Sequence, residues 1–262
     1  MAEEESKPDS GSGSGPENDQ EQGFLSHLIE LRSRLVKAAL SIAVVTLCLM
    51  PFMQRIFDFM SQPMVAALPQ GSKLLATGVI SPFFVPLKVT IFTAFLIASP
   101  YVLYQVWAFV APGLYQHEKR LALPVIVSSV LMFFGGIAYC YFVVFGFVFH
   151  YIAAFAPNNV NVAPDIDQYF EFVIRMFLAF GLAFEVPIVV MLLVRTGMVT
   201  VAKLRQVRPY TIVGAFVLAA IVTPPDATSM LLLAVPLCLL FELGVLLASF
   251  VGVKKSEEET TA

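Results

Sequence analysis

Residues 122–151 read ALPVIVSSVLMFFGGIAYCYFVVFGFVFHY, and they lie in a window from Leu121 to Pro164 that has no Asp, Glu, Lys or Arg. A helix needs only about 20 apolar residues to cross the hydrocarbon core of a bilayer, which is about 30 Å thick. The whole chain of 262 residues is 58% hydrophobic and only 13% charged. This composition is too apolar for an ordinary soluble domain, so it predicts a polytopic membrane protein with lipid as its main solvent.

The chain has six apolar stretches, which predict an all-α fold with six transmembrane helices. We expect spans over residues 35–54, 82–110, 122–151, 168–194, 209–223 and 227–250. The segment 56–80 is too polar to span and is interpreted as an ordered cap on the outer side. The second and third spans reach roughly 45 Å, whereas the fifth reaches only about 22 Å. We therefore expect a concave bundle of uneven height, with short fifth and sixth helices.

Positive charge is concentrated on one side of this bundle. Six crossings place both termini on the same side, and the segments on that side carry eleven Lys or Arg residues, whereas the opposite loops carry only Arg55 and Lys73. The positive-inside rule therefore places both termini in the cytoplasm. The eleven residues are Arg32, Arg34, Lys37, Lys119, Arg120, Arg195, Lys203, Arg205, Arg208, Lys254 and Lys255.

Two terminal segments flank the membrane domain, which we expect over residues 24–253. Residues 1–23 are rich in Gly, Ser, Glu and Asp and offer almost nothing to bury, so they are predicted to be a disordered acidic tail. This tail lacks an apolar stretch with a cleavage site, which argues against a signal or transit peptide. Residues 254–262 are interpreted as a second cytoplasmic tail.

Enzymatic chemistry has no signature in this sequence. The motifs of zinc proteases, serine hydrolases and P-loop nucleotide-binding proteins are missing. His27, His117 and His150 are too scattered for a metal set, and solvated histidines near the membrane surface are the preferred interpretation of the first two. The three cysteines lie inside apolar runs and are interpreted as buried small hydrophobic residues. We expect no catalysis, no metal, no cofactor and no binding of nucleic acid.

Glu30 and Glu118 are the only two carboxylates on the basic side between Phe24 and Lys255. Taken singly, Glu30 could form an i,i+4 pair with Arg34, and Glu118 could be a solvated loop charge. Taken together, on a face short of acid, they indicate a site for a cationic partner. Carboxylates accept the fork of an arginine guanidinium through two parallel hydrogen bonds, which the point charge of a lysine does not reproduce.

Glu185 is a different candidate, because it lies near the middle of the fourth span. An ionisable group at that depth is expensive and usually faces the bundle interior or a functional path. One interpretation is a protonated carboxyl that is hydrogen-bonded to another helix. The other is a proton-sensitive element, and in a rival hypothesis for the whole chain it is the coupling carboxylate of a proton-coupled secondary transporter. Such carriers often show inverted repeats and broken helices, and neither is evident here.

Longer motifs run in order along nearly the whole chain outside the tails: HLIELRSRL (27–35), SPFF (81–84), YQVWAFVAPGLYQHEKR (104–120), FGLAFEVP (180–187), RPY (208–210) and TPPD (223–226). In content and spacing they resemble the TatC family, the multispanning receptor subunit of the twin-arginine, Sec-independent protein translocase. The resemblance implies a protein of the bacterial inner membrane that recognises signal peptides with consecutive arginines on folded cargo. It also implies the single-span partners TatA and TatB, self-association in a larger complex, and transport driven by the protonmotive force.

The resemblance further implies roles for individual residues. Signal-peptide recognition falls on Glu30, Glu118, Phe109, Arg32 and Arg34. Glu185 matches a glutamate that meets a polar group on a partner's transmembrane helix, while Pro63 and Asp226 match functionally sensitive positions. In this scheme the apolar part of the signal supplies affinity for any bilayer. The two acids supply specificity, on the order of 3–6 kcal/mol before desolvation.

Overall fold

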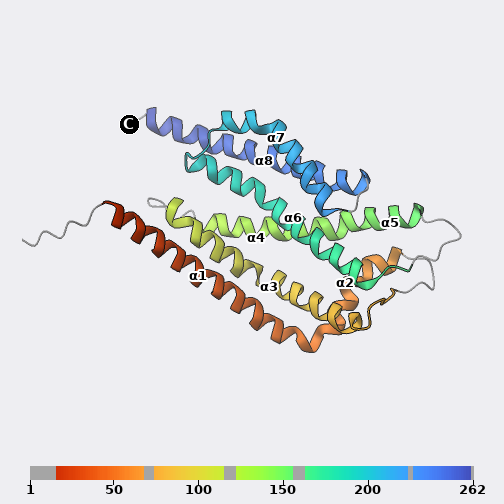
Figure 1. Ribbon diagram of the computed structural model, residues 1–262. Helices are drawn as coiled ribbons and strands as arrows, with labels where there is room; N and C mark the ends of the chain where they lie inside the picture. The colour runs from red at the N-terminus through yellow and green to blue at the C-terminus, as the bar shows by residue number, and fades with distance from the viewer. Residues whose placement is uncertain (1–15, 68–73, 115–121, 156–162, 224–226, 261–262) are drawn as a thin grey trace, which may run out of the picture.

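The computed structural model describes residues 16–67, 74–114, 122–155, 163–223 and 227–260, and the side chains within 27–66, 74–110, 123–150, 163–223 and 227–250. Nearly all of these residues are helical (Figure 1). The helices are α1 (Pro16–Leu49), α2 (Met53–Ala67), α3 (Ser81–Leu114), α4 (Ala122–Tyr139), α5 (Phe145–Phe155), α6 (Ile166–Arg195), α7 (Val201–Val222) and α8 (Ala227–Thr260). A 3₁₀ turn, Met50–Phe52, joins α1 to α2, and a π-helical turn, Cys140–Val144, joins α4 to α5.

Five segments of the described chain are long and apolar enough to cross a membrane. They are His27–Ala66, Ser81–Val110, Leu123–His150, Ile166–Arg195 and Ala227–Phe250. Helix α7 lies between the last two of these segments in the chain and corresponds to the expected fifth span. Three basic residues in its first turns, Lys203, Arg205 and Arg208, leave it only a short apolar part. The prediction of an all-α membrane protein with six helices is confirmed. The start of α1 and the end of α8 lie at the same end of the bundle (Figure 1).

The boundaries differ from the sequence expectation in several places. Helix α8 is not short: it has 34 residues, and its apolar part alone has 24, which at about 1.5 Å per residue suffices to cross the hydrocarbon core. The expected bounds of the sixth span, 227–250, coincide with this apolar part, and only the description of that span as short is wrong. Helix α1 begins at Pro16, inside the segment 1–23 assigned to the disordered tail, and α8 continues into the segment 254–262. The expected outer cap, 56–80, contains most of helix α2.

Helix α6 is the centre of the fold, since it contacts α3, α4, α7 and α8. The largest fully buried side chains around it are aromatic: Phe133, Phe145, Phe170, Phe177 and Phe180. Helix α1, in contrast, packs mainly against α3 and leaves Leu35, Leu40 and Leu47 exposed. Exposed leucines are expected on a helix whose outer face contacts lipid rather than water. Among the described residues, the side chains of α6 therefore make up much of the buried core, whereas much of α1 is exposed.

Small residues allow two helices to approach α6 closely. A Cβ added at Gly136 in α4 would lie 2.5 Å from the carbonyl oxygen of Phe180 in α6. A Cβ added at Gly244 in α8 would lie 2.9 Å from Cα of Pro187, also in α6. Close backbone contacts at small residues are a common way to pack helices in membranes, where no hydrophobic effect drives helix association. These two contacts hold α4 and α8 against the part of α6 that carries Glu185.

A polar latch joins the start of α6 to the segment that precedes α3. Asp165 is the N-cap of α6 and accepts hydrogen bonds from the backbone N–H groups of Asp167 (2.9 Å) and Gln168 (3.2 Å). It also accepts from the backbone N–H of Thr77 at 3.1 Å and from the Thr77 hydroxyl. Leu75 pairs with Pro164 and Ile166 through backbone hydrogen bonds of 2.9 Å. The latch fixes the register of α3 against α6 at the end of the bundle away from the chain termini.

Candidate functional site

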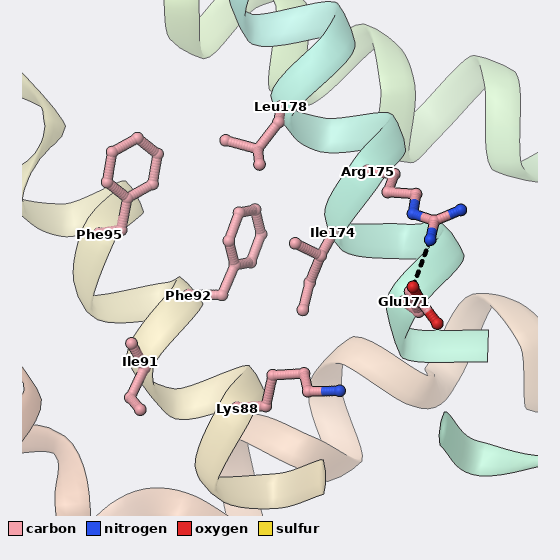
Figure 2. Close-up of a pocket in the computed structure, with 8 residues that line it drawn as sticks. All are labelled: Lys88, Ile91, Phe92, Phe95, Glu171, Ile174, Arg175 and Leu178. Carbon is pink, nitrogen blue, oxygen red and sulfur yellow. Dashed lines mark hydrogen bonds and ion pairs between the residues drawn. The ribbon is translucent and has the colours of Figure 1, made fainter. Parts of the chain in front are cut away.

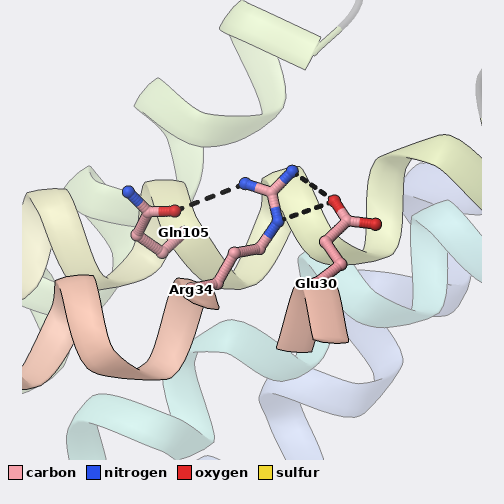
Figure 3. A network of polar contacts seen from close by, with 3 residues as sticks. All are labelled: Glu30, Arg34 and Gln105. Atoms are coloured by element: carbon pink, nitrogen blue, oxygen red, sulfur yellow. Dashed lines mark hydrogen bonds and ion pairs between the residues drawn. The ribbon is translucent and has the colours of Figure 1, made fainter. Parts of the chain in front are cut away.

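Glu30 forms an ion pair with Arg34, one helical turn later on α1. Nε and Nη2 of Arg34 donate to Oε1 of Glu30 at 2.9 and 2.6 Å, while Nη1 donates to Oε1 of Gln105 on α3 at 3.3 Å (Figure 3). The Arg34 side chain is 24% exposed and that of Glu30 is 36% exposed. Only one oxygen of Glu30 takes part, and Oε2 is turned away from Arg34 (Figure 3). The carboxylate is thus held in place and still accessible from one side.

A second contact joins the same two helices. The rings of His27 in α1 and Phe109 in α3 are stacked, with centroids 4.3 Å apart and planes inclined by 20°. His27 is exposed and Phe109 is half-buried. The stack lies about one turn from Glu30 on α1 and about one turn from Gln105 on α3, because four residues make roughly one helical turn. The structure therefore brings together Glu30, Arg34 and Phe109, three of the residues that the sequence nominates.

The remaining nominated residues are distributed differently. Arg32 is exposed on α1, next to this cluster in the chain. Glu118, nine residues after Phe109, lies outside the described residues, so its pairing with Glu30 stays a prediction. Asp226 also lies outside the described residues. Pro63 is half-buried inside α2, which is at the other end of the bundle from the start of α1 (Figure 1).

Glu185 lies in a buried polar network between three helices. The indole Nε1 of Trp107 in α3 donates to Oγ of Ser129 in α4 at 2.8 Å, and the Ser129 hydroxyl donates to Oε2 of Glu185 at 2.6 Å. The Glu185 side chain is only 8% exposed. Its other oxygen, Oε1, is buried without a hydrogen-bond partner among the described residues. Only one of the two carboxyl oxygens therefore has a hydrogen-bond partner among the described residues. A donor supplied by a water or another polypeptide would stabilise the other oxygen.

Four residues that complete these clusters carry no functional prediction from the sequence: His27, Gln105, Trp107 and Ser129. Gln105 and Ser129 are polar and buried inside apolar spans, which is itself a signal, since buried polar side chains in membranes usually have partners. The preferred interpretation of His27 as a solvated residue omits its stacking on Phe109. Among the described residues there is no group of three or more His, Cys, Asp or Glu side chains that could hold a metal ion.

Comparison with known proteins identifies the family. Residues 26–236 match the family described as Sec-independent protein translocase protein (TatC). The chain belongs to the TatC family. It is 49% identical to the TatC protein of Azotobacter chroococcum over 94% of this chain and 95% of the relative, and 47% identical to that of Escherichia coli K12 over 91% and 93%. A crystal structure of the twin-arginine translocase receptor TatC superimposes with a TM-score of 0.77 at 33% identity, covering 86% of this chain and 99% of the other.

Membership in the TatC family decides between the functional hypotheses. The protein is a receptor subunit of the twin-arginine translocase and a multi-pass protein of the bacterial inner membrane, and it is not an enzyme. The rival hypothesis of a proton-coupled secondary transporter is therefore wrong. The transporter hypothesis rested on the position of Glu185 near the middle of a span. A buried carboxyl group can equally join helices through hydrogen bonds, as Glu185 does with Ser129.

Proposed function

We propose that the cytoplasmic ends of α1 and α3, with the segment 115–121 that follows α3, bind the consecutive arginines of signal peptides on folded cargo. Glu30 and Glu118 are the two carboxylates of this site, Phe109 forms its apolar wall, and Arg32 and Arg34 set its charge. TatA, TatB and further copies of the chain complete the export complex, which is driven by the protonmotive force.

The observation that carries the proposal is the state of Glu30. Its carboxylate is fixed by Arg34 through Oε1 alone, and Oε2 is directed away from that pair (Figure 3). An incoming guanidinium can therefore donate to Oε2 without first breaking the internal ion pair. Charge-assisted hydrogen bonds of this kind contribute about 1.5–3 kcal/mol each. A site that is already ordered also avoids part of the entropy loss on binding.

Arg34 sets the selectivity of this arrangement. A ligand arginine that binds Glu30 with both of its parallel N–H groups needs both carboxylate oxygens, so it must share or displace Arg34 at Oε1. Oε1 of Gln105 already accepts a hydrogen bond from Nη1 of Arg34. Arg34 therefore keeps one partner when its ion pair with Glu30 weakens. A ligand lysine offers a single, strongly hydrated point charge, so it competes less well with Arg34 for the oxygens of Glu30.

Phe109 and His27 form the neighbouring surface. Their stacked rings lie beside Glu30, and a guanidinium can lie over the face of an aromatic ring. Cation–π contacts contribute roughly 0.5–1 kcal/mol at exposed sites.

Glu185 belongs to a separate site. Its Oε1, which has no hydrogen-bond partner among the described residues, is suited to a polar group on the transmembrane helix of a partner subunit.

The test is binding of labelled signal peptides to the purified full chain in lipid nanodiscs. We expect Glu30→Gln to weaken binding of an Arg-Arg peptide by roughly 10- to 150-fold, which corresponds to the loss of one charge-assisted hydrogen bond. Binding of the matched Lys-Lys peptide should change much less, so the preference for arginine should shrink. Glu118→Gln should give the same pattern if both acids form the site.

The matched control is Asp58→Asn, which removes an exposed carboxylate from α2 at the other end of the bundle. It should leave the affinities for both peptides unchanged. The thermal stability of Glu30→Gln should fall only slightly, because an i,i+4 ion pair on one helix contributes a few tenths of a kcal/mol. If Glu30→Gln binds both peptides as the unmodified chain does, Glu30 is not part of the recognition site.

A further inference from the structure

We infer that a pocket between α3 and α6, at the end of the bundle opposite the signal-peptide site, binds an anionic phospholipid of the outer leaflet. The pocket has a volume of about 600 Å³, within the range of small-ligand sites. Its lining is Lys88, Ile91, Phe92, Phe95, Glu171, Ile174, Arg175 and Leu178 (Figure 2). The site is independent of the proposed signal-peptide binding, with which it shares no residue.

The lining separates into an apolar wall and a charged mouth. Phe92, Phe95, Ile174 and Leu178 form the wall, and the Lys88 side chain extends from α3 toward α6 at one end of it (Figure 2). Five of the eight lining side chains are hydrocarbon only, which suits an acyl chain better than a polar solute. A molecule with an apolar tail and an anionic head fits this division.

The mouth carries one positive charge that the described residues do not neutralise. Arg175 is paired with Glu171 one turn earlier on α6, so these two charges cancel. No described carboxylate forms an ion pair with Lys88: Glu171 pairs with Arg175, and the other two pairs of the described residues, Glu30 with Arg34 and Glu242 with Arg208, lie away from the pocket. The mouth therefore has a net charge of +1, which matches the single negative charge of a phosphodiester.

The depth of Lys88 favours a lipid as the source of that phosphate. Lys88 is seven residues after Ser81, where α3 begins, so it lies about 10 Å from the outer end of the helix. Arg175 lies nine residues after Ile166 at the start of α6, about 14 Å from that end. The headgroup region of a leaflet is only about 5–8 Å thick. With the starts of α3 and α6 at the outer surface of that region, both cations lie at or below its lower boundary. A lysine at this depth reaches outward to the phosphate level, with its carbon chain among the acyl chains.

The experiment measures lipid binding to the purified, delipidated full chain by native mass spectrometry and by thermal stabilisation. The probes are phosphatidylglycerol, phosphatidylcholine and inorganic phosphate. We expect phosphatidylglycerol to bind at least about tenfold more tightly than phosphatidylcholine, and Lys88→Gln to remove most of this preference. Lys88→Arg should retain it, because the positive charge is kept. The control Lys203→Gln, which removes an exposed lysine from α7, should also retain it.

Each alternative occupant predicts a different outcome. Equal stabilisation by inorganic phosphate and by phosphatidylglycerol would identify a simple anion site and overturn the lipid proposal. Equal binding of both lipids, or an unchanged preference in Lys88→Gln, would overturn it as well. Affinity for the Arg-Arg signal peptide should be the same in Lys88→Gln and in the unmodified chain. This readout separates failure of the lipid site from failure of the signal-peptide site.

Discussion

Ser129 is the single residue on which two buried polar groups depend. It accepts from the indole of Trp107 and donates to the carboxyl group of Glu185, and all three side chains are buried. A hydroxyl can accept and donate at once through a single oxygen, whereas a methyl group can do neither. The network thereby joins α3, α4 and α6 in the buried interior of the bundle, where the low dielectric strengthens hydrogen bonds.

Ser129→Ala should disturb both of these buried polar groups at once. The substitution leaves Trp107 without an acceptor and Glu185 without a donor, and we expect it to lower the free energy of unfolding by about 1–2 kcal/mol. Trp107 is the one tryptophan of the chain, so its fluorescence emission should shift when the indole loses its partner. The control is Ser128→Ala, an exposed neighbour whose effect should stay within about 0.5 kcal/mol. Identical emission and stability in both variants would contradict this role of Ser129.

At the scale of elements, the close approach of α4 to α6 depends on the absence of a side chain at Gly136. A Cβ there would lie 2.5 Å from a backbone oxygen of α6, which cannot rotate away as a side chain can. Gly146 in α5 offers the opposite case, because a Cβ at that position would meet nothing within 4 Å. The packing of α4 on α6 therefore requires a glycine at position 136, whereas no packing contact requires one at position 146.

Substitution of these glycines by alanine should have effects of opposite sign. Gly136→Ala should destabilise the protein by about 1–3 kcal/mol, because α4 must move away from α6. Gly146→Ala should be neutral or stabilise it by up to about 1 kcal/mol, because alanine is the better helix former. Thermal denaturation in a mild detergent measures both. A stable Gly136→Ala variant would mean that the two helices separate at little cost.

The latch at the outer ends of α3 and α6 predicts a dependence of stability on pH. Hydrogen bonds from the Thr77 hydroxyl, followed by those from backbone N–H groups, hold the pKa of Asp165 below its usual value. The stabilisation is present above the pKa of the unfolded chain, about 3.9, and is lost as pH falls through the lower folded value. Melting temperature should therefore decline in acid. Asp165→Asn and Thr77→Val should each flatten that decline, and an unaltered acid profile in both would contradict the assignment.

At the scale of the whole molecule, the two ends of the bundle have different chemistry. The cytoplasmic end holds a carboxylate among many bases, with Glu30 ordered by Arg34 and Gln105. The outer end holds the Asp165 latch and the cationic pocket of Lys88. Helix α3 connects the two, since it carries Lys88 near its start and Gln105 and Phe109 near its end. The buried network of Glu185 lies between them.

The amino-acid sequence by itself determined the membrane class, the six helices and the family, because hydropathy and long motifs are properties of the chain read in order. It also nominated Glu30 and Glu185, since an acid among bases or inside a span is conspicuous without coordinates. It described the span 227–250 as short although its bounds match the apolar part of α8, and it did not find Gln105, Trp107 or Ser129 as partners. Those pairings join residues 22 to 71 positions apart, and only the tertiary packing of α1, α3, α4 and α6 sets the helix rotations that bring them within hydrogen-bond distance.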